Sequence, residues 1–111
     1  MILTPIVEWQ YVAALIMCHV VGDFAFQSAW MAMEKAKSKE VLVYHVVTQA
    51  SPFVLLSFVP GTHVTPQGLV LHMLLHAVVD YLKGRGVIKT IWQDQLCHAV
   101  CTAFEHAIGW L

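Results

Sequence analysis

The sequence predicts an all-α fold, a bundle of four transmembrane helices whose neighbours run antiparallel. Composition is the first observation: the 111 residues are 59% hydrophobic and 12% charged, with a mean hydropathy of +0.68. A soluble domain carries about 25% charged residues, and a short chain buries too little of its surface to hide this much apolar area. Segment length is the second observation. The apolar runs are about 20 residues long, which matches a hydrocarbon core of roughly 30 Å, and isolated spans must be helical to satisfy their backbone. We therefore expect a single integral-membrane domain over residues 1–111.

Each predicted helix has its own boundary signals. Pro5 suits a first helical turn, Pro60 and the glycine after it end the second apolar run, and Gly84 ends the third. Pro52 should open the hydrogen-bond ladder of the second helix. The helices are expected at about 5–30, 40–59, 65–83 and 90–111.

The basic residues predict the orientation of the bundle. All six fall in the two loops that four spans would place on one side: Lys35, Lys37, Lys39, Lys83, Arg85 and Lys89. The positive-inside rule makes that side cytoplasmic, so both termini should lie on the outer side. This predicts an integral protein of a bacterial inner membrane, with membrane lipids as partners. The net charge of −1 and the few basic residues argue against a nucleic-acid partner.

Polar residues recur inside the apolar segments at helical spacing. His19, Asp23 and Gln27 lie four residues apart and should share one face of a helix. The same spacing relates His76 to Asp80, and Asp94 to His98. Antiparallel packing would bring these pairs and His45 to one level near the cytoplasmic interface. Ionisable residues inside a membrane mark functional sites by default.

Three carboxylates at one level need compensation, either by protonation or by a divalent cation. Hydrogen bonds between His and Asp alone are a third possibility. Imidazole and carboxylate ligands suit Zn²⁺ best, with Mn²⁺ or Fe²⁺ as alternatives. The predicted metal ligands are His19, Asp23, His76, Asp80 and His98. Asp94 and His45 are the predicted catalytic residues, and those expected to orient the ligands or the substrate are Gln27, Gln95, Lys83 and Arg85.

The motif set resembles a family of small bacterial and phage integral-membrane proteins known as domain of unknown function 3307. The resemblance rests on HVVGDFAFQ at 19–27, the lone His45, HAVVDYLK at 76–83 and DQLCH at 94–98, and it covers about residues 13–106. It points to the same His, Asp and Gln residues and implies no activity. The layout is also similar to that of membrane-bound metal-dependent hydrolases.

The leading expectation is a metal-dependent hydrolase that acts on a lipid or another amphiphile at the cytoplasmic membrane face. The first alternative is a non-enzymatic adaptor or inhibitor, of bacterial or phage origin, in which the His/Asp cluster is structural and a membrane or membrane-proximal protein is the partner. The second is a component of a metal-ion or proton transporter, for which a homo-oligomer would be needed. No G-x-S-x-G motif, P-loop or dinucleotide fingerprint is present.

Overall fold

The computed structural model describes residues 4–111 and is helical throughout, with no strand among those residues. Residues 1–3 of the predicted domain lie outside the described part. Five α-helices and one π-helical turn follow one another along the chain: α1 Glu8–Val20, η1 Val21–Ala25, α2 Ala29–Glu34, α3 Lys39–Leu56, α4 Pro66–Gly84 and α5 Ile91–Ala107.

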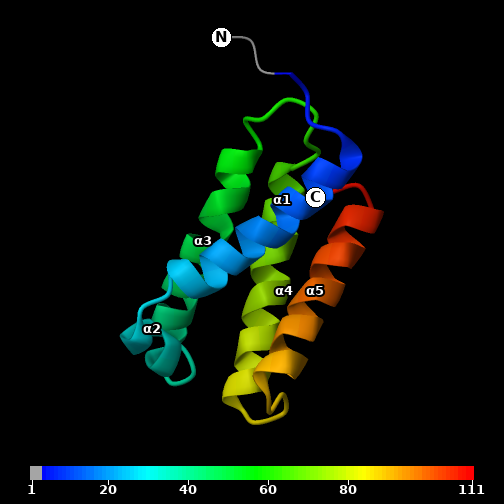
Figure 1. The fold of residues 1–111 in the computed structure, drawn as a ribbon. Coiled ribbons are helices and arrows are strands. Elements are labelled where there is room, and N and C mark those ends of the chain that lie inside the picture. Colours follow the sequence, from blue (N-terminus) through cyan, green and yellow to red (C-terminus); the bar gives the residue numbers. More distant parts are fainter. Residues whose placement is uncertain (1–3) are drawn as a thin grey trace.

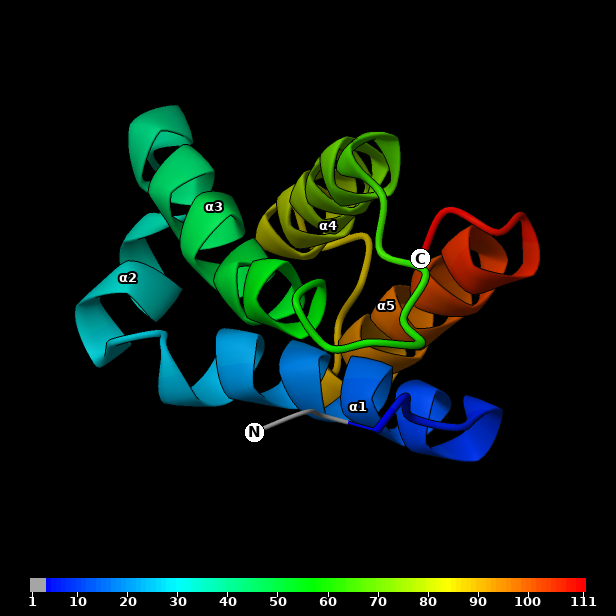
Figure 2. The same cartoon turned by 90° about the horizontal axis from the view of Figure 1, so that it is seen from above.

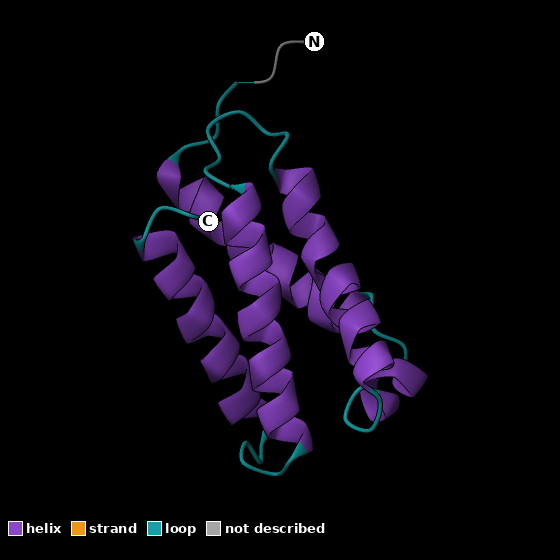
Figure 3. Cartoon of the chain, turned by 180° about the vertical axis from the view of Figure 1, so that it is seen from behind, coloured by secondary structure: helices purple, strands orange, loops and turns teal. Residues whose placement is uncertain are grey.

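The three long helices α3, α4 and α5 stand side by side, and α1 crosses them obliquely (Figure 1). Seen from above, α1 lies along one side of the layer that the other three form (Figure 2). The short helix α2 folds back beside the start of α3. The view from behind shows the C-terminus and the α3–α4 connection at one end of the bundle, and the α4–α5 turn at the other (Figure 3).

Local sequence signals fix where the helices begin. The side chains of Ser28, Ser38, Thr65 and Thr90 each accept a hydrogen bond from the backbone N–H three residues later, which satisfies one free donor of the first turn. Pro52 lies inside α3 without ending it. The carbonyl of Thr48, which a proline at 52 cannot pair, accepts a hydrogen bond from the Ser51 hydroxyl at 2.6 Å.

An apolar core fills the end of the bundle that holds the C-terminus. Tyr11, Leu15, Phe53 and Leu111 are buried there in one cluster. Two backbone hydrogen bonds close this end, from Ile6 N–H to the Pro60 carbonyl and from Thr65 N–H to the Trp110 carbonyl. Toward the other end, buried Asp and His side chains lie in the interior together with apolar residues such as Val41, Val46 and Val79.

The predicted transmembrane bundle is wrong. No helix of the described residues is both long enough and apolar enough to cross a membrane. The helix α1 has 13 residues, or about 20 Å at 1.5 Å per residue, against the roughly 30 Å of a hydrocarbon core. The longer α4 carries two buried histidines and Asp80 in its interior. The predictions of a membrane protein, a bacterial inner-membrane location and termini on an outer side therefore lose their basis.

The predicted first helix, about 5–30, is also divided. Regular α-helix ends at Val20, and a π-helical turn follows in which Phe26 N–H bonds to the Val21 carbonyl at 3.1 Å. The chain then leaves the helix and restarts at Ala29. Five α-helices thus replace the predicted four, and Gln27 lies in a loop and not on the face it was expected to share with His19.

Candidate metal centre

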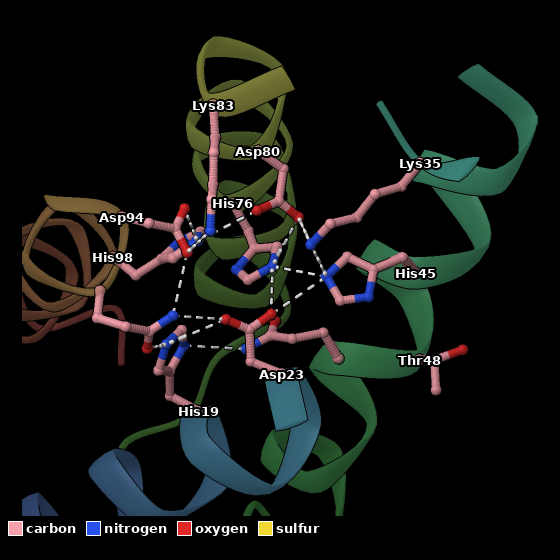
Figure 4. A network of polar contacts seen from close by, with 12 residues as sticks. His19, Asp23, Lys35, His45, Thr48, His76, Asp80, Lys83, Asp94 and His98 are labelled. Carbon is pink, nitrogen blue, oxygen red and sulfur yellow. Dashed lines mark hydrogen bonds and ion pairs between the residues drawn. The ribbon is translucent and has the colours of Figure 1, made fainter. Parts of the chain in front are cut away.

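Four helical elements deliver buried polar side chains to one point, toward the end of the bundle opposite the apolar core (Figure 4). Asp23 comes from η1, His45 from α3, His76 and Asp80 from α4, and Asp94 with His98 from α5. All six are at most 4% exposed. Each helix has its polar face turned inward here, which is the convergence that the spacing of the sequence pairs predicts.

Four of these residues place one donor atom each around a common centre. The atoms are Asp23 Oδ1, His45 Nε2, His76 Nε2 and Asp80 Oδ2. Five of the distances between them are 3.1–3.4 Å. Four ligands at bond lengths of about 2.0–2.1 Å from a tetrahedral zinc ion would lie about 3.3–3.4 Å apart, because the edge of a tetrahedron is about 1.63 times its radius. These buried groups could hold a metal ion.

A second group lies against the first. His98 Nε2 is 3.3 Å from Asp80 Oδ1 and 3.4 Å from Asp94 Oδ1. Asp23 belongs to both groups, since its carboxylate also lies within ligand range of Asp94 and His98. The two groups therefore share one pocket.

Two lysines neutralise part of the negative charge. Lys35 Nζ lies 3.1 Å from Asp80 Oδ2 and 3.4 Å from His45 Nε2. Lys83 Nζ lies 3.6 Å from Asp94 Oδ2, on the more exposed side of the cluster. Lys83 thus lies at the centre, as the sequence predicts. Lys35 is an addition, because the sequence places it in a surface loop.

The carboxylates are held in their ionised form. Burial alone raises the pKa of Asp23, but the rings of His45 and His76 outweigh it and hold that pKa well below its usual range. Burial is likewise outweighed at Asp80, where the rings of His45, His76 and His98 keep the pKa low. Of the two ways to compensate these charges, the structure favours ionisation with opposite charge nearby over protonated carboxyls.

The pKa values of the histidines are shifted in opposite directions. Burial lowers the pKa of His98, but the carboxylates of Asp80 and Asp94 prevail and raise it to about 9. The pKa of His45 is also raised, because Asp23 and Asp80 outweigh burial. At His19 burial prevails and lowers the pKa to about 4, so this ring is neutral near pH 7.

His19 lies at the edge of the centre and takes part in a chain of hydrogen bonds. Gln95 donates through Nε2 to Asp23 Oδ2 at 3.0 Å and to Asp94 Oδ2 at 3.1 Å. Because a carboxylate only accepts, the Gln95 amide is oriented, and its Oε1 must accept from His19 Nε2–H at 3.0 Å. His19 Nδ1 then accepts from Gln49 Nε2 at 3.2 Å.

The chain continues away from the centre. Gln49 Oε1 accepts from His72 Nε2–H at 2.9 Å, and His72 Nδ1 contacts Glu105 Oε2 at 2.9 Å. Glu105 and Gln49 are 0% exposed. Both ring nitrogens of His19 are therefore hydrogen-bonded to amides, and His19 belongs to neither of the two donor groups. Its role as a metal ligand stays a prediction.

The other predicted residues lie around an opening at this end of the bundle. Gln27, Lys35, Asp80 and Lys83 line a cavity of about 360 Å³. Arg85 lies apart from the centre, with its guanidinium 5.8 Å from the centre of the Tyr81 ring.

Sequence reasoning did not assign Lys35, His72 or Glu105 to the centre. For the last two a signal existed, since each extends a polar helical face: His72 is one turn from His76, and Glu105 is seven residues from His98. Lys35 has no such signal, because it reaches Asp80 only after the chain reverses at Gln27 and Ser28.

Comparison with known proteins supports a family assignment. No curated protein and no solved structure matches the chain significantly. One family model matches residues 11–109, which include every residue of the two groups. The match confirms the family assignment that the motifs predict, without its bacterial, phage or membrane character, and the chain belongs to the family described as protein of unknown function (DUF3307).

Proposed function

We propose that this protein is a metal-dependent hydrolase and that Asp23, His45, His76 and Asp80 hold its cation. One observation carries the proposal: among four buried donor atoms from three separate elements, five of the six mutual distances match those between the ligands of a tetrahedral ion. Burying carboxylates and imidazoles costs free energy, and packing of the helices alone does not require it.

The donor set favours Zn²⁺. Two imidazoles and two carboxylates with tetrahedral spacing suit zinc, whereas Ca²⁺ and Mg²⁺ prefer more oxygen ligands in larger or octahedral shells. Mn²⁺ and Fe²⁺ accept the same donors and are the alternatives. A divalent cation in this position would polarise the scissile group and lower the pKa of a coordinated water toward 7.

Two hollows beside the centre suit an amphiphilic substrate with an anionic group. The 360 Å³ cavity offers the ammonium groups of Lys35 and Lys83 and the amide of Gln27 to an anion. A groove of about 300 Å³ between α1 and α5 is lined by apolar residues such as Leu15, Ile16 and Ala103, and it reaches His19. An ester with an anionic head and an apolar chain would use both.

Asp94 is the proposed general base. Its Oδ1 is buried and accepts no well-directed hydrogen bond, and its pKa lies below the usual range because the His98 ring and Lys83 outweigh burial. In the reaction the oxygen of water forms a bond to the acyl or phosphoryl centre and Asp94 takes its proton. The bond to the leaving group breaks, and the leaving oxygen receives a proton from the same carboxyl. His45 was expected to share this role, but its Nε2 lies among the four donor atoms, and we assign it to the cation.

The two alternatives from the sequence, an adaptor with a structural His/Asp cluster and a transporter component, remain predictions. The same is true of a bacterial or phage origin and of a homo-oligomer. No contact among the described residues favours any of them over hydrolysis.

The test combines metal content with turnover. Purified protein is analysed for zinc, manganese and iron, then assayed with bis-p-nitrophenyl phosphate and p-nitrophenyl butyrate before and after chelation. We expect bound metal, loss of turnover with chelator, and its return with Zn²⁺. His76→Ala should lose the metal, while His63→Ala, an exposed histidine in the α3–α4 connection, should keep it. Folded wild type without metal affinity would overturn the proposal.

A further inference from the structure

We propose a second divalent-cation site, formed by Asp80 Oδ1, Asp94 Oδ1 and His98 Nε2, directly beside the first. This inference rests on the proposed function and deepens it: the centre would be binuclear, with Asp80 shared between two cations. The second site would be formed by atoms that the first site leaves without partners.

Three atoms at this position are buried and unsatisfied. Asp80 Oδ1, Asp94 Oδ1 and His98 Nε2 form no well-directed hydrogen bond with any described residue. They nevertheless face one another, with His98 Nε2 at 3.3 Å from the first oxygen and 3.4 Å from the second. A buried polar atom without a partner costs free energy, and two carboxylate oxygens aimed at one nitrogen call for positive charge between them.

Asp80 divides its two oxygens between the two sites. Its Oδ2 lies 3.1 Å from His45 Nε2 and 3.3 Å from His76 Nε2, while its Oδ1 faces His98. A carboxylate used in this way joins two cations about 3.5–4 Å apart in binuclear hydrolases. Asp23, which lies within ligand range of both groups, borders the second site as well.

The second carboxylate oxygen of Asp94 contacts residues that lie outside the second site. Gln95 donates to Asp94 Oδ2, and Lys83 lies 3.6 Å from the same oxygen. These contacts turn Asp94 so that Oδ1 points inward. Such hydrogen bonds to the outer atoms of ligands are what orients them in metal sites.

The two sites differ in the number of protein donors. The first has four, so that a water or substrate there would be a fifth ligand, whereas the second has three, the number typical of zinc sites that leave a position for water or substrate. In a binuclear centre Asp94 would be a ligand in place of the general base proposed for the single-cation centre, because a second cation would itself lower the pKa of water there.

The competing explanation is a proton. A doubly protonated His98 between Asp80 and Asp94 would also satisfy both carboxylates, without a second cation. The two explanations differ in metal stoichiometry and in whether two paramagnetic ions interact, so both can be measured without reference to activity.

The experiment loads the full chain with Mn²⁺ or Zn²⁺ and measures bound metal by mass spectrometry, with equilibrium dialysis against free ion. Wild type, His98→Ala, Asp94→Asn and the control His63→Ala are compared, each checked for helical content by circular dichroism. We expect two equivalents in wild type and His63→Ala, and one in His98→Ala and Asp94→Asn. Electron paramagnetic resonance of the Mn²⁺-loaded wild type should show a spin-coupled pair, a readout that needs no variant.

One equivalent in wild type, unchanged in His98→Ala and without spin coupling, would overturn the second site and leave the proposed function intact. Two equivalents that persist in both variants would also overturn it, because the second ion would then lie elsewhere. Failure of folded wild type to bind any metal would overturn the proposed function itself.

Discussion

Asp80 shows how individual residues share the charge of this centre. It is 3% exposed and contacts Lys35, His45, His76 and His98. A carboxylate so far from water is stable only when cations or donors surround it. In the absence of metal, Lys35 supplies a permanent positive charge 3.1 Å from it. The stability of the metal-free protein should therefore depend on that lysine.

Lys35→Met tests this dependence. With chelator present, we expect the free energy of unfolding to fall by about 1–3 kcal/mol, because the buried Asp80 carboxylate loses a partner. Lys37→Met is the matched control, since Lys37 is 68% exposed and lies 3.8 Å from Glu34. An exposed pair of this kind contributes roughly 0–1 kcal/mol. Urea denaturation measures both. Equal effects of the two substitutions would contradict the role assigned to Lys35.

His19 offers a second test at the level of single atoms. The hydrogen-bond chain requires a neutral ring with its proton on Nε2, and burial lowers its pKa to about 4. Long-range ¹H–¹⁵N NMR at pH 6 should show an unprotonated Nδ1. In Gln49→Glu the new carboxylate only accepts, so Nδ1 must become a donor and the His19 pKa should rise. A proton on Nδ1 in wild type would contradict the direction of the chain.

The sequence could predict the residues that follow a helical period and not those that depend on a chain reversal. His76 with Asp80 and Asp94 with His98 are one turn apart, so their shared faces follow from helix geometry alone. Gln27 and Lys35 depend on where the first helix ends. That end is set by a π-helical turn, and no residue pattern in this stretch predicts such a turn.

At the level of elements, this π-helical turn places Asp23. It lies where α1 meets α3, and π-turns inside helices are frequent at functional sites. Gly22 permits the contact: a Cβ atom there would lie 2.4 Å from the Gln49 carbonyl oxygen. The close approach of the two backbones brings Asp23 within 3.2 Å of His45.

Gly22→Ala should therefore separate η1 from α3. We expect a loss of about 1–3 kcal/mol in the free energy of unfolding, typical of an overpacked contact, and a weaker affinity for Zn²⁺ because Asp23 moves. Ala25→Leu is the control, since residue 25 belongs to the same turn but is exposed. Thermal denaturation and dialysis against Zn²⁺ measure the two effects. Unchanged metal affinity in a destabilised Gly22→Ala would contradict the role of the π-helical turn in placing Asp23 at the centre.

At the level of the whole molecule, the helices predicted from composition are confirmed, but the predicted distribution of apolar residues along them is wrong. Large side chains such as Trp9, Leu55, Phe58 and Trp92 are more than two-thirds exposed. The same helices carry the buried polar residues of the centre on their inner faces. A mean hydropathy cannot distinguish a uniformly apolar span from a helix with one apolar and one ionisable face, and this is why the predicted spans failed.

The collected titrations of the centre predict a maximum in the stability of the metal-free protein. His19 has a folded pKa of about 4 against an ordinary 6.5, so only the unfolded chain takes up this proton as pH falls from 6.5 to 4, and stability falls with it. His98 has a folded pKa of about 9, so its contribution is complete below pH 6.5 and is lost as pH rises toward 9. The free energy of unfolding should therefore peak near pH 6.5.

Urea titrations with chelator at intervals between pH 4 and pH 9 measure this curve. On each side of the maximum the free energy of unfolding should fall by on the order of 1–3 kcal/mol, because the interactions are shared among several groups. His98→Gln removes the group whose proton is lost on the alkaline side and should flatten that limb, while the acid limb, which depends on His19 and on the low pKa values of Asp23 and Asp80, should persist. A wild-type stability that keeps rising from pH 6.5 to 9 would mean that His98 is neutral in the folded protein, and that the carboxylates around it are balanced by Lys35 and Lys83 alone.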